Sequence, residues 1–141
     1  MKMRYIHFRF IFFIVAVLFC TAVGFAGKNS TKIEQGAIST FNEYASAWKS
    51  RDIKRVWKLM SPKLRKGNEN SIEKFNAFVK SNGFYPSNFS IRRVVLNGNE
   101  ASITADVTYS DFSGKKMGTD LEESIFVLIG GNWYFDRYSH K

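Results

Sequence analysis

The sequence has little of the chemistry on which many enzymes depend. Its 141 residues include one cysteine and two histidines. His7 lies near the N-terminus and His140 next to the C-terminus, so a histidine-dependent triad or metal cluster cannot be assembled. No Gly-x-Ser-x-Gly elbow, P-loop or dinucleotide fingerprint occurs. The sequence therefore assigns no catalytic residue, no metal and no cofactor.

Charge is absent from a long run near the N-terminus. Three basic residues, Lys2, Arg4 and Arg9, precede an uncharged, mostly apolar stretch at 10–26. A basic start followed by an apolar run and small residues is typical of a secretory signal peptide. We expect cleavage after Ala26. The predicted protein is exported, either to the periplasm or to the medium.

Two alternatives to cleavage stay open at this segment. The apolar run reaches the lower end of the length that spans a bilayer, so it could remain as a membrane anchor with the domain outside. Lipid attachment at Cys20 is the other, although Phe19 stands where lipoprotein signals have a small residue. If residues 1–26 are removed, the only cysteine goes with them, and the mature chain can form neither a disulfide nor a cysteine metal site.

The remaining chain, 27–141, has the length of one domain and no linker rich in Pro, Gly or Ser. Its first half shows apolar residues at three- and four-residue steps, which predicts helices over 33–48 and 53–60 and a third helix between Asn70 and Gly83. Asp52 is the expected N-cap of the second helix, and Asn70 that of the third.

The second half changes to a two-residue period. Residues 101–109 alternate strictly between apolar and polar side chains, as a half-buried strand does. Further strands are predicted at 89–96, 121–129 and 133–138, with tight turns at Asn97-Gly98 and Gly130-Gly131 and a bulge at Arg92-Arg93. The predicted fold class is α+β: three N-terminal helices packed on a curved antiparallel sheet of about four strands.

Four segments carry a resemblance to a known family. They are Phe41-Asn-Glu-Tyr-Ala-Ser-Ala-Trp-Lys-Ser-Arg-Asp52, Val56-Trp-Lys-Leu-Met-Ser-Pro-Lys-Leu-Arg65, Ser71-Ile-Glu-Lys-Phe75 and Gly130-Gly-Asn-Trp-Tyr-Phe-Asp136. With them the chain resembles the nuclear transport factor two-like superfamily, which has a cystatin-like cone fold, over about residues 33 to 138. It looks like the exported bacterial branch, whose members are of uncharacterised function.

The resemblance implies a cavity inside the cone. In enzymes of the ketosteroid isomerase-like type, an acidic base and a hydroxyl or acid donor lie on its walls. The candidates in this chain are Asp106, Asp120, Asp136 and Tyr44, and none matches a family motif, so no catalytic role is carried over. Asp106 is expected to face solvent. Asp136 shares a strand face with Tyr134 and Tyr138, and would enter the cavity only if that face is concave.

Aromatic residues are plentiful, with 14 Phe, 6 Tyr and 3 Trp. Such rings belong first to the core, but a subset could line a ligand pocket. The predicted pocket residues are Phe41, Tyr44, Trp48, Trp57, Tyr109 and Trp133.

Positive charge is concentrated in one part of the sequence. The whole chain has a formal net charge of +9. Eight basic residues define a predicted basic face: Lys49, Arg51, Lys54, Arg55, Lys58, Lys63, Arg65 and Lys66. A solvated helix face explains most such runs, while anionic lipid headgroups or an acidic partner are the functional alternatives. Nucleic acid is not expected for an exported protein.

Three hypotheses follow for the function. The first is an exported, non-catalytic binding or accessory domain that uses the cavity or the basic face for a small apolar ligand, a membrane surface or a protein partner. The second is a small pocket enzyme, which needs a buried carboxylate beside the cavity. The third is a membrane-anchored adaptor of a secretion machinery, which requires an uncleaved anchor. A homodimer is expected from the resemblance alone.

Overall fold

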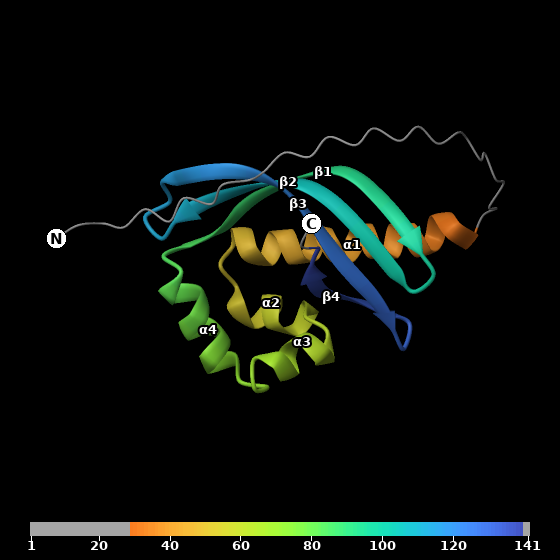
Figure 1. Cartoon of the computed structure of the whole chain (residues 1–141), viewed down its shortest axis with the longest axis horizontal. Coiled ribbons are helices and arrows are strands. Elements are labelled where there is room, and N and C mark those ends of the chain that lie inside the picture. The colour runs from red at the N-terminus through yellow and green to blue at the C-terminus, as the bar shows by residue number, and fades with distance from the viewer. Residues whose placement is uncertain (1–28, 140–141) are drawn as a thin grey trace, which may run out of the picture.

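The computed structural model describes residues 29–139, so the predicted signal peptide or anchor at 1–26 lies outside the described residues. The elements are α1 (Asn29–Lys49), α2 (Ile53–Leu59), α3 (Pro62–Gly67), α4 (Ile72–Ser81), β1 (Phe84–Asn97), β2 (Glu100–Asp111), β3 (Lys116–Ile129) and β4 (Asn132–Tyr138). Figure 1 shows α1 lying under the curved sheet and α2 to α4 gathered below it. None of the helices in this range is long and apolar enough to cross a membrane.

Helix α1 packs its apolar stripe against the sheet, chiefly against β1 and also against β4 and β2. Ala37, Phe41, Tyr44, Ala47 and Trp48 are buried at the expected three- and four-residue steps. Ile33, which continues the stripe in sequence, is 41% exposed, so the buried face begins one turn later.

Within residues 29–139 the structure has four helices, where the sequence predicts three. Asp52 caps α2 as predicted, because its side chain accepts a hydrogen bond from the Arg55 N–H at 3.0 Å. The Ser61-Pro62 pair ends the predicted helix but also begins a new one. The Ser61 side chain caps α3, and Pro62 takes a first-turn position where it needs no N–H partner.

Helix α4 is capped one residue later than predicted. Ser71, not Asn70, accepts the hydrogen bond from the Lys74 N–H, at 3.2 Å, and it also donates to Glu73. Asn70 has a φ of 52° and belongs to the turn before the cap. Helix α4 buries Phe75 and Val79.

The sheet is antiparallel with the strand order β1-β2-β3-β4, so the predicted fold class is confirmed. The strict alternation of β2 is borne out: Ala101, Ile103, Ala105 and Val107 are buried. The predicted bulge exists, because Ile91 pairs with Ala105 and Arg93 with Thr104, which leaves Arg92 as an extra residue. The strands are longer than predicted, since β1 begins at Phe84 and β3 at Lys116.

The sequence predicts one of its two tight turns at the observed residues and the other one residue too early. Gly130 and Gly131 form the predicted two-residue turn, with φ of 58° and 83°, values that a type I′ turn requires and glycine supplies. The turn between β1 and β2 consists of Gly98 and Asn99 instead of Asn97 and Gly98, because Asn97 still pairs with Glu100.

A bulge in β4 changes which of its side chains face the core. Ile125 pairs with Arg137, but Phe126 pairs with Phe135, so Asp136 is an extra residue in the strand. Without the bulge, Tyr138 would lie on the face opposite Phe135. With it, both rings point to the concave side, where their centroids lie 5.0 Å apart.

The core is built from aromatic rings between α1 and the sheet. Phe41 lies edge-on to Phe89 and Phe126, and Tyr44 stacks on Phe135 with centroids 4.7 Å apart. Five rings arranged edge to face and offset fill the space that aliphatic side chains fill in other small domains. This cluster fixes α1 on β1, β3 and β4, and two of its rings, Tyr44 and Phe135, line the cavity described below.

Candidate functional site

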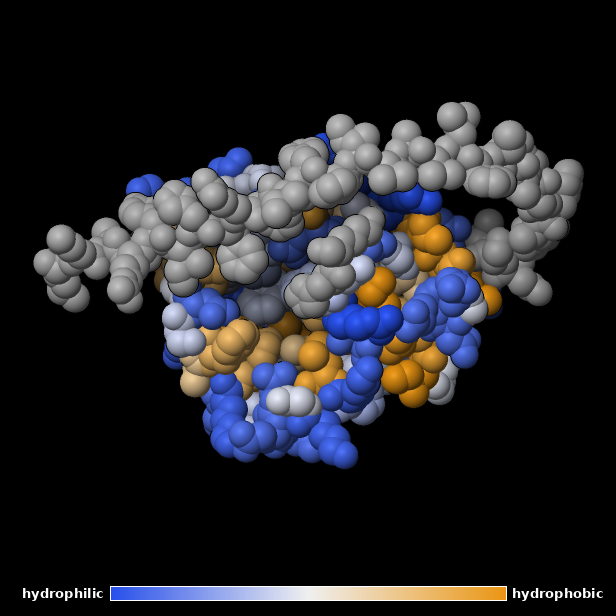
Figure 2. Space-filling model, in the orientation of Figure 1, coloured by the Kyte–Doolittle hydropathy of each residue, from blue (hydrophilic) through white to orange (hydrophobic). Residues whose placement is uncertain are grey.

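A cavity of about 550 Å³ lies between the concave face of the sheet and helices α3 and α4. Most of its wall is apolar. Its lining residues are Tyr44, Trp48, Met60, Leu64, Asn68, Phe75, Phe78, Val79, Asn82, Phe84, Pro86, Tyr109, Phe135, Arg137 and Tyr138. Figure 2 shows apolar side chains around a hollow near the centre of the molecular surface in view, with hydrophilic residues below them.

The structure brings three of the six predicted pocket residues to this cavity, namely Tyr44, Trp48 and Tyr109. The other three lie elsewhere and are corrected here. Phe41 is 1% exposed and packs among core rings, because α1 presses it onto the sheet. Trp57 packs against Phe75 with a centroid distance of 5.6 Å and is not part of the cavity lining.

Trp133 lies against α1 rather than in the cavity. A methyl group at Gly36 would come within 3.1 Å of Trp133 Nε1, so the glycine is what allows this close approach. The ring is 7% exposed and belongs to the core cluster. The sequence shows the aromatic character of Trp133 but not the layer in which it lies.

Most of the remaining lining residues were missed by the sequence. Leu64 and Asn68 come from α3, the helix that the sequence does not predict, and Tyr138 reaches the cavity only because of the bulge at Asp136. Phe75, Phe78 and Val79 could have been predicted as lining residues, because their spacing places all three on one face of α4.

Two phenylalanines at the edge of the cavity are exposed to solvent. Phe78 is 58% exposed and Phe84 is 44% exposed, although Phe78 lies on the same helix face as the buried Phe75 and Val79. Phe78 borders the cavity instead of packing into the core. Exposed aromatic rings beside a cavity are a common feature of binding sites.

Two tyrosine hydroxyls meet in the cavity wall. The Tyr44 and Tyr138 hydroxyl oxygens lie 3.3 Å apart, so one donates a hydrogen bond to the other. Burial raises the pKa of Tyr44 to about 12, and it also raises the pKa of Tyr138 well above its usual value. Both phenols therefore stay neutral at physiological pH and offer hydrogen-bond donors and acceptors inside an apolar wall.

A third tyrosine joins the cavity to a carboxylate. Tyr109 donates a hydrogen bond to Glu122 Oε1, and burial followed by this contact raises the pKa of the Tyr109 phenol. Burial also raises the pKa of Glu122, and the nearby Asp120 charge adds to the shift. Sequence reasoning missed Glu122, because it stands in the mostly polar run of residues 119–124, and the strand register is needed to place it on the same sheet face as Tyr109.

Glu122 and Asp120 line a smaller recess of about 370 Å³ that adjoins the cavity. The two spaces share the side chains of Phe84 and Tyr109. Among the predicted acidic candidates, Asp120 is thus the one placed beside the cavity. Asp106 forms an ion pair with Arg92 and is not part of the cavity lining.

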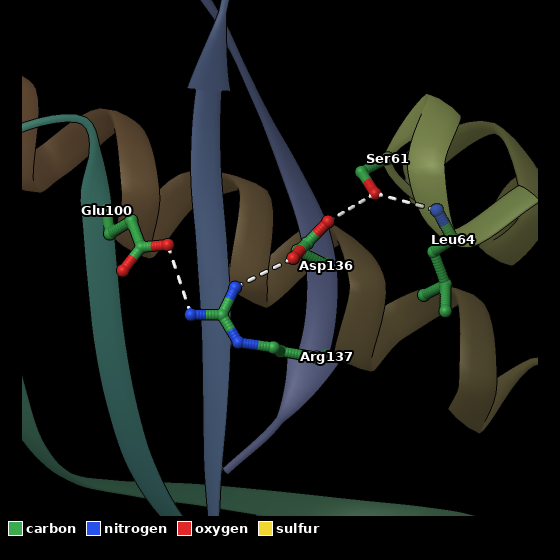
Figure 3. A network of polar contacts seen from close by, with 5 residues as sticks. All are labelled: Ser61, Leu64, Glu100, Asp136 and Arg137. Carbon is green, nitrogen blue, oxygen red and sulfur yellow. Dashed lines mark hydrogen bonds and ion pairs between the residues drawn. The ribbon is translucent and has the colours of Figure 1, made fainter.

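Asp136, the other acidic candidate, joins α3 to the sheet and does not line the cavity. Its Oδ1 accepts a hydrogen bond from the Ser61 hydroxyl at 2.6 Å, and its Oδ2 accepts one from Arg137 Nη1 at 2.8 Å (Figure 3). Arg137 also donates to Glu100 at 3.1 Å. Ser61 accepts from the Leu64 N–H at 3.1 Å, so the network fixes the start of the helix that forms one cavity wall.

The predicted basic face follows the end of α1, then α2 and α3. Two of its residues have partners: Arg55 pairs with Glu43 at 3.5 Å, and Arg51 lies over the Tyr85 ring at 4.6 Å and donates to the Phe112 carbonyl. Arg65 is half-buried. The lysines are exposed and form no ion pair within residues 29–139; they are Lys49, Lys54, Lys58, Lys63 and Lys66.

Comparison with known proteins gives structural likenesses only. No protein family model matches the sequence, and no curated protein is similar to it. The solution structure of a SEC-C motif containing protein from Rhodopseudomonas palustris is similar at a TM-score of 0.54 and 13% identity, over 82% of this chain and 94% of that one. At this identity the likeness shows a shared fold and nothing of function.

Two further solved structures carry the fold names to which the sequence resemblance points. One is a protein of unknown function with a cystatin-like fold from Nostoc punctiforme, with a TM-score of 0.48 and 14% identity over 77% of this chain and 87% of that one. The other is a nuclear transport factor two-like protein of unknown function from Burkholderia pseudomallei, with a TM-score of 0.49 and 12% identity over 74% and 91%. Both likenesses are too distant to carry an argument about function.

Proposed function

We propose that this domain binds a small, mainly apolar ligand in the cavity between α3, α4 and the concave face of the sheet. The observation that carries the proposal is the cavity itself, about 550 Å³ in volume and lined mostly by aromatic and aliphatic side chains. Ligand pockets of small molecules have this range of volumes and this kind of wall. The domain is the exported, non-catalytic binder that we expect from the sequence.

The polar groups of the cavity support binding of a ligand that has one polar end. Tyr44 from α1, Tyr109 from β2 and Tyr138 from β4 line it together with Phe75, Phe78 and Val79 from α4. A few placed hydroxyls in an apolar wall orient a ligand without requiring a reaction. The entrance beside Phe78 and Phe84 would admit it, because both rings are exposed.

A cavity filled by a larger side chain should bind a small apolar ligand less tightly. We expect Leu64→Trp to weaken binding of an uncharged apolar dye such as Nile red by at least about tenfold, because the larger ring occupies the space beside α3. Dye fluorescence titration measures the affinity. The matched control is Val95→Trp, which adds a ring at a position that is 39% exposed and outside the cavity lining. Equal loss in both variants, or in neither, would contradict the proposal.

A second candidate function is a pocket enzyme, and one observation favours it. Glu122 is a half-buried carboxylate beside the cavity, its pKa is raised, and it accepts a hydrogen bond from Tyr109. A carboxylate with a raised pKa is suited to accept a proton, and neutral phenols can donate to a developing oxyanion. Turnover of any bound ligand, lost in Glu122→Gln while binding is kept, would separate the enzyme from the binder.

The basic face supports a second contact, with an anionic membrane surface. Lys54 and Lys58 are exposed on α2 and form no ion pair within the described residues. We expect Lys54→Glu/Lys58→Glu to lower partitioning onto phosphatidylglycerol vesicles by more than about tenfold, since each basic residue near such a surface contributes about 1 kcal/mol. Co-sedimentation measures it. Lys115→Glu/Lys116→Glu, at the end of the turn between β2 and β3 and the start of β3, is the matched control and should bind as the wild type does.

A further inference from the structure

The ligand of the proposed cavity can be assigned to a chemical class. We propose that it carries a protonated amine, which the carboxylate of Glu122 receives in the recess on β2 and β3 that adjoins the cavity. This inference rests on the proposed function, since it names the polar end of the molecule whose apolar body the cavity would hold. It is argued from the position of Glu122, its hydrogen bonds and its neighbours.

The strand register places Glu122 on the inner side of the sheet. It pairs with Ala105, which is buried, so its side chain points to the concave face that holds the cavity. Tyr109 and Tyr138 line the main cavity, and each also lines a smaller recess that Glu122 shares. Glu122 therefore lies behind the Tyr109 and Tyr138 rings of the cavity wall, and a ligand that moves these rings apart would contact it.

One oxygen of Glu122 is left for a ligand. Oε1 accepts the hydrogen bond from Tyr109, but Oε2 is buried and has no hydrogen-bond partner among the described residues. A buried carboxylate oxygen without a donor is costly, and a donor supplied by a ligand would remove that cost. Within residues 29–139, neither Glu122 nor Asp120 forms an ion pair, although the chain has 21 basic residues and 12 acidic ones.

The rings around these carboxylates suit a cation. Phe84 and Tyr109 meet edge to face with their centroids 5.5 Å apart, and both line the recess with Asp120 and Glu122. An alkylammonium group is attracted both to carboxylates and to aromatic faces, and it brings hydrogen-bond donors that a carboxylate can accept. A hydroxyl offers a donor without the charge, so it should bind less tightly.

The same groups disfavour a ligand that ends in a carboxylate. Such an anion would lie beside Glu122 and Asp120, and like charges at short distance repel. Arg137 is the one basic residue in the cavity lining, and its guanidinium is already held by Asp136 and Glu100. The expected order of affinity for ligands of equal chain length is amine, then alcohol, then carboxylate.

A series of three probes tests the inference on the mature protein. Dodecylamine, dodecanol and dodecanoate share one alkyl chain, and each can be titrated below its micelle concentration or solubility limit. Tryptophan fluorescence follows binding, because Trp48, one of the three tryptophans, lines the cavity. We expect the amine to bind at least about tenfold more tightly than dodecanoate. The net positive charge of the protein would favour the opposite order, so a preference for the amine cannot come from unspecific attraction.

Glu122→Gln then identifies the group responsible. Its affinity for the amine should fall to that for the alcohol. Affinity for the alcohol should be kept, because the amide oxygen of glutamine still accepts a hydrogen bond from a hydroxyl, and this binding also reports correct folding. Glu43→Gln, on the exposed side of α1, alters the net charge equally and should keep the amine preference. Dodecanoate binding as well as the amine, or an amine preference that survives in Glu122→Gln, would overturn the inference and leave the cavity proposal standing. Binding of none of the three would overturn the proposed function itself.

Discussion

Replacing Phe135 by alanine should lower the free energy of unfolding by about 3–5 kcal/mol, the cost of removing a large aromatic side chain from a well-packed core. Phe135 is 3% exposed and lies where three other rings meet. Tyr44 stacks on it with centroids 4.7 Å apart, Tyr138 lies at 5.0 Å and Phe126 at 5.7 Å. No neighbour can collapse into the gap, because each ring is held by its own strand or helix.

Urea unfolding followed by tryptophan fluorescence measures this loss. Phe135→Leu, which keeps most of the volume, should cost less than about half as much. Phe78→Ala is the matched control, because it removes the same side chain from a position that is 58% exposed and should cost less than about 1 kcal/mol. A loss below about 1 kcal/mol in Phe135→Ala would mean that the aromatic cluster does not hold the sheet and α1 together.

The sequence predicts well those elements whose pattern is long and regular. Residues 101–109 alternate without exception, and β2 lies there with Ala101, Ile103, Ala105 and Val107 buried. The pair Gly130-Gly131 forms its turn as predicted, because few residues other than glycine accept two successive positive φ values. Local steric rules and side-chain periodicity decide these features, and both can be seen in one segment at a time.

The missed features depend on contacts between distant segments. Helix α3 has six residues, too few to show a helical period, and it is fixed by the hydrogen bond from Ser61 to Asp136, which lies 75 residues further along the chain. The bulge at Asp136 has no glycine or proline to mark it. A prediction from alternation therefore places Tyr138 on the same strand face as Tyr134, whereas the structure turns it to the cavity.

The candidate site illustrates the same limit. Glu122 stands in a mostly polar run and looks like a solvated edge residue. Only the structure shows that it shares a sheet face with Tyr109 and accepts its hydrogen bond. The predicted pocket includes Phe41 and Trp133, which belong to the core, because the prediction rests on aromatic residue type and not on the layer in which each ring lies. Aromatic type alone cannot separate a core ring from a cavity ring, because both are buried for the same physical reason.

Replacing Asp136 by alanine should lower the free energy of unfolding by about 2–3 kcal/mol, because it leaves buried polar groups without partners. Ser61, which is 0% exposed, would lose the acceptor of its 2.6 Å hydrogen bond, and Arg137 would keep only Glu100. Asp106→Ala is the matched control. Its partner Arg92 has a side chain that is 65% exposed, and such surface pairs contribute about 0–1 kcal/mol.

The contribution of Asp136 should also depend on pH. Burial raises the pKa of this carboxyl, but the hydrogen bonds from Ser61 and Arg137 outweigh burial and hold the pKa below its usual value of 3.8. A group whose pKa is lowered by folding stabilises the protein above the unfolded-state value, and this stabilisation is lost as the pH falls through the lower folded-state pKa.

Asp136→Asn keeps an acceptor for Ser61 but has no proton to gain. The stability difference between wild type and Asp136→Asn should therefore be largest near neutral pH and shrink as acid is added, in urea unfolding measured along a pH series. A difference that stays constant below pH 3.8 would show that the charge of Asp136 does not hold α3 to the sheet.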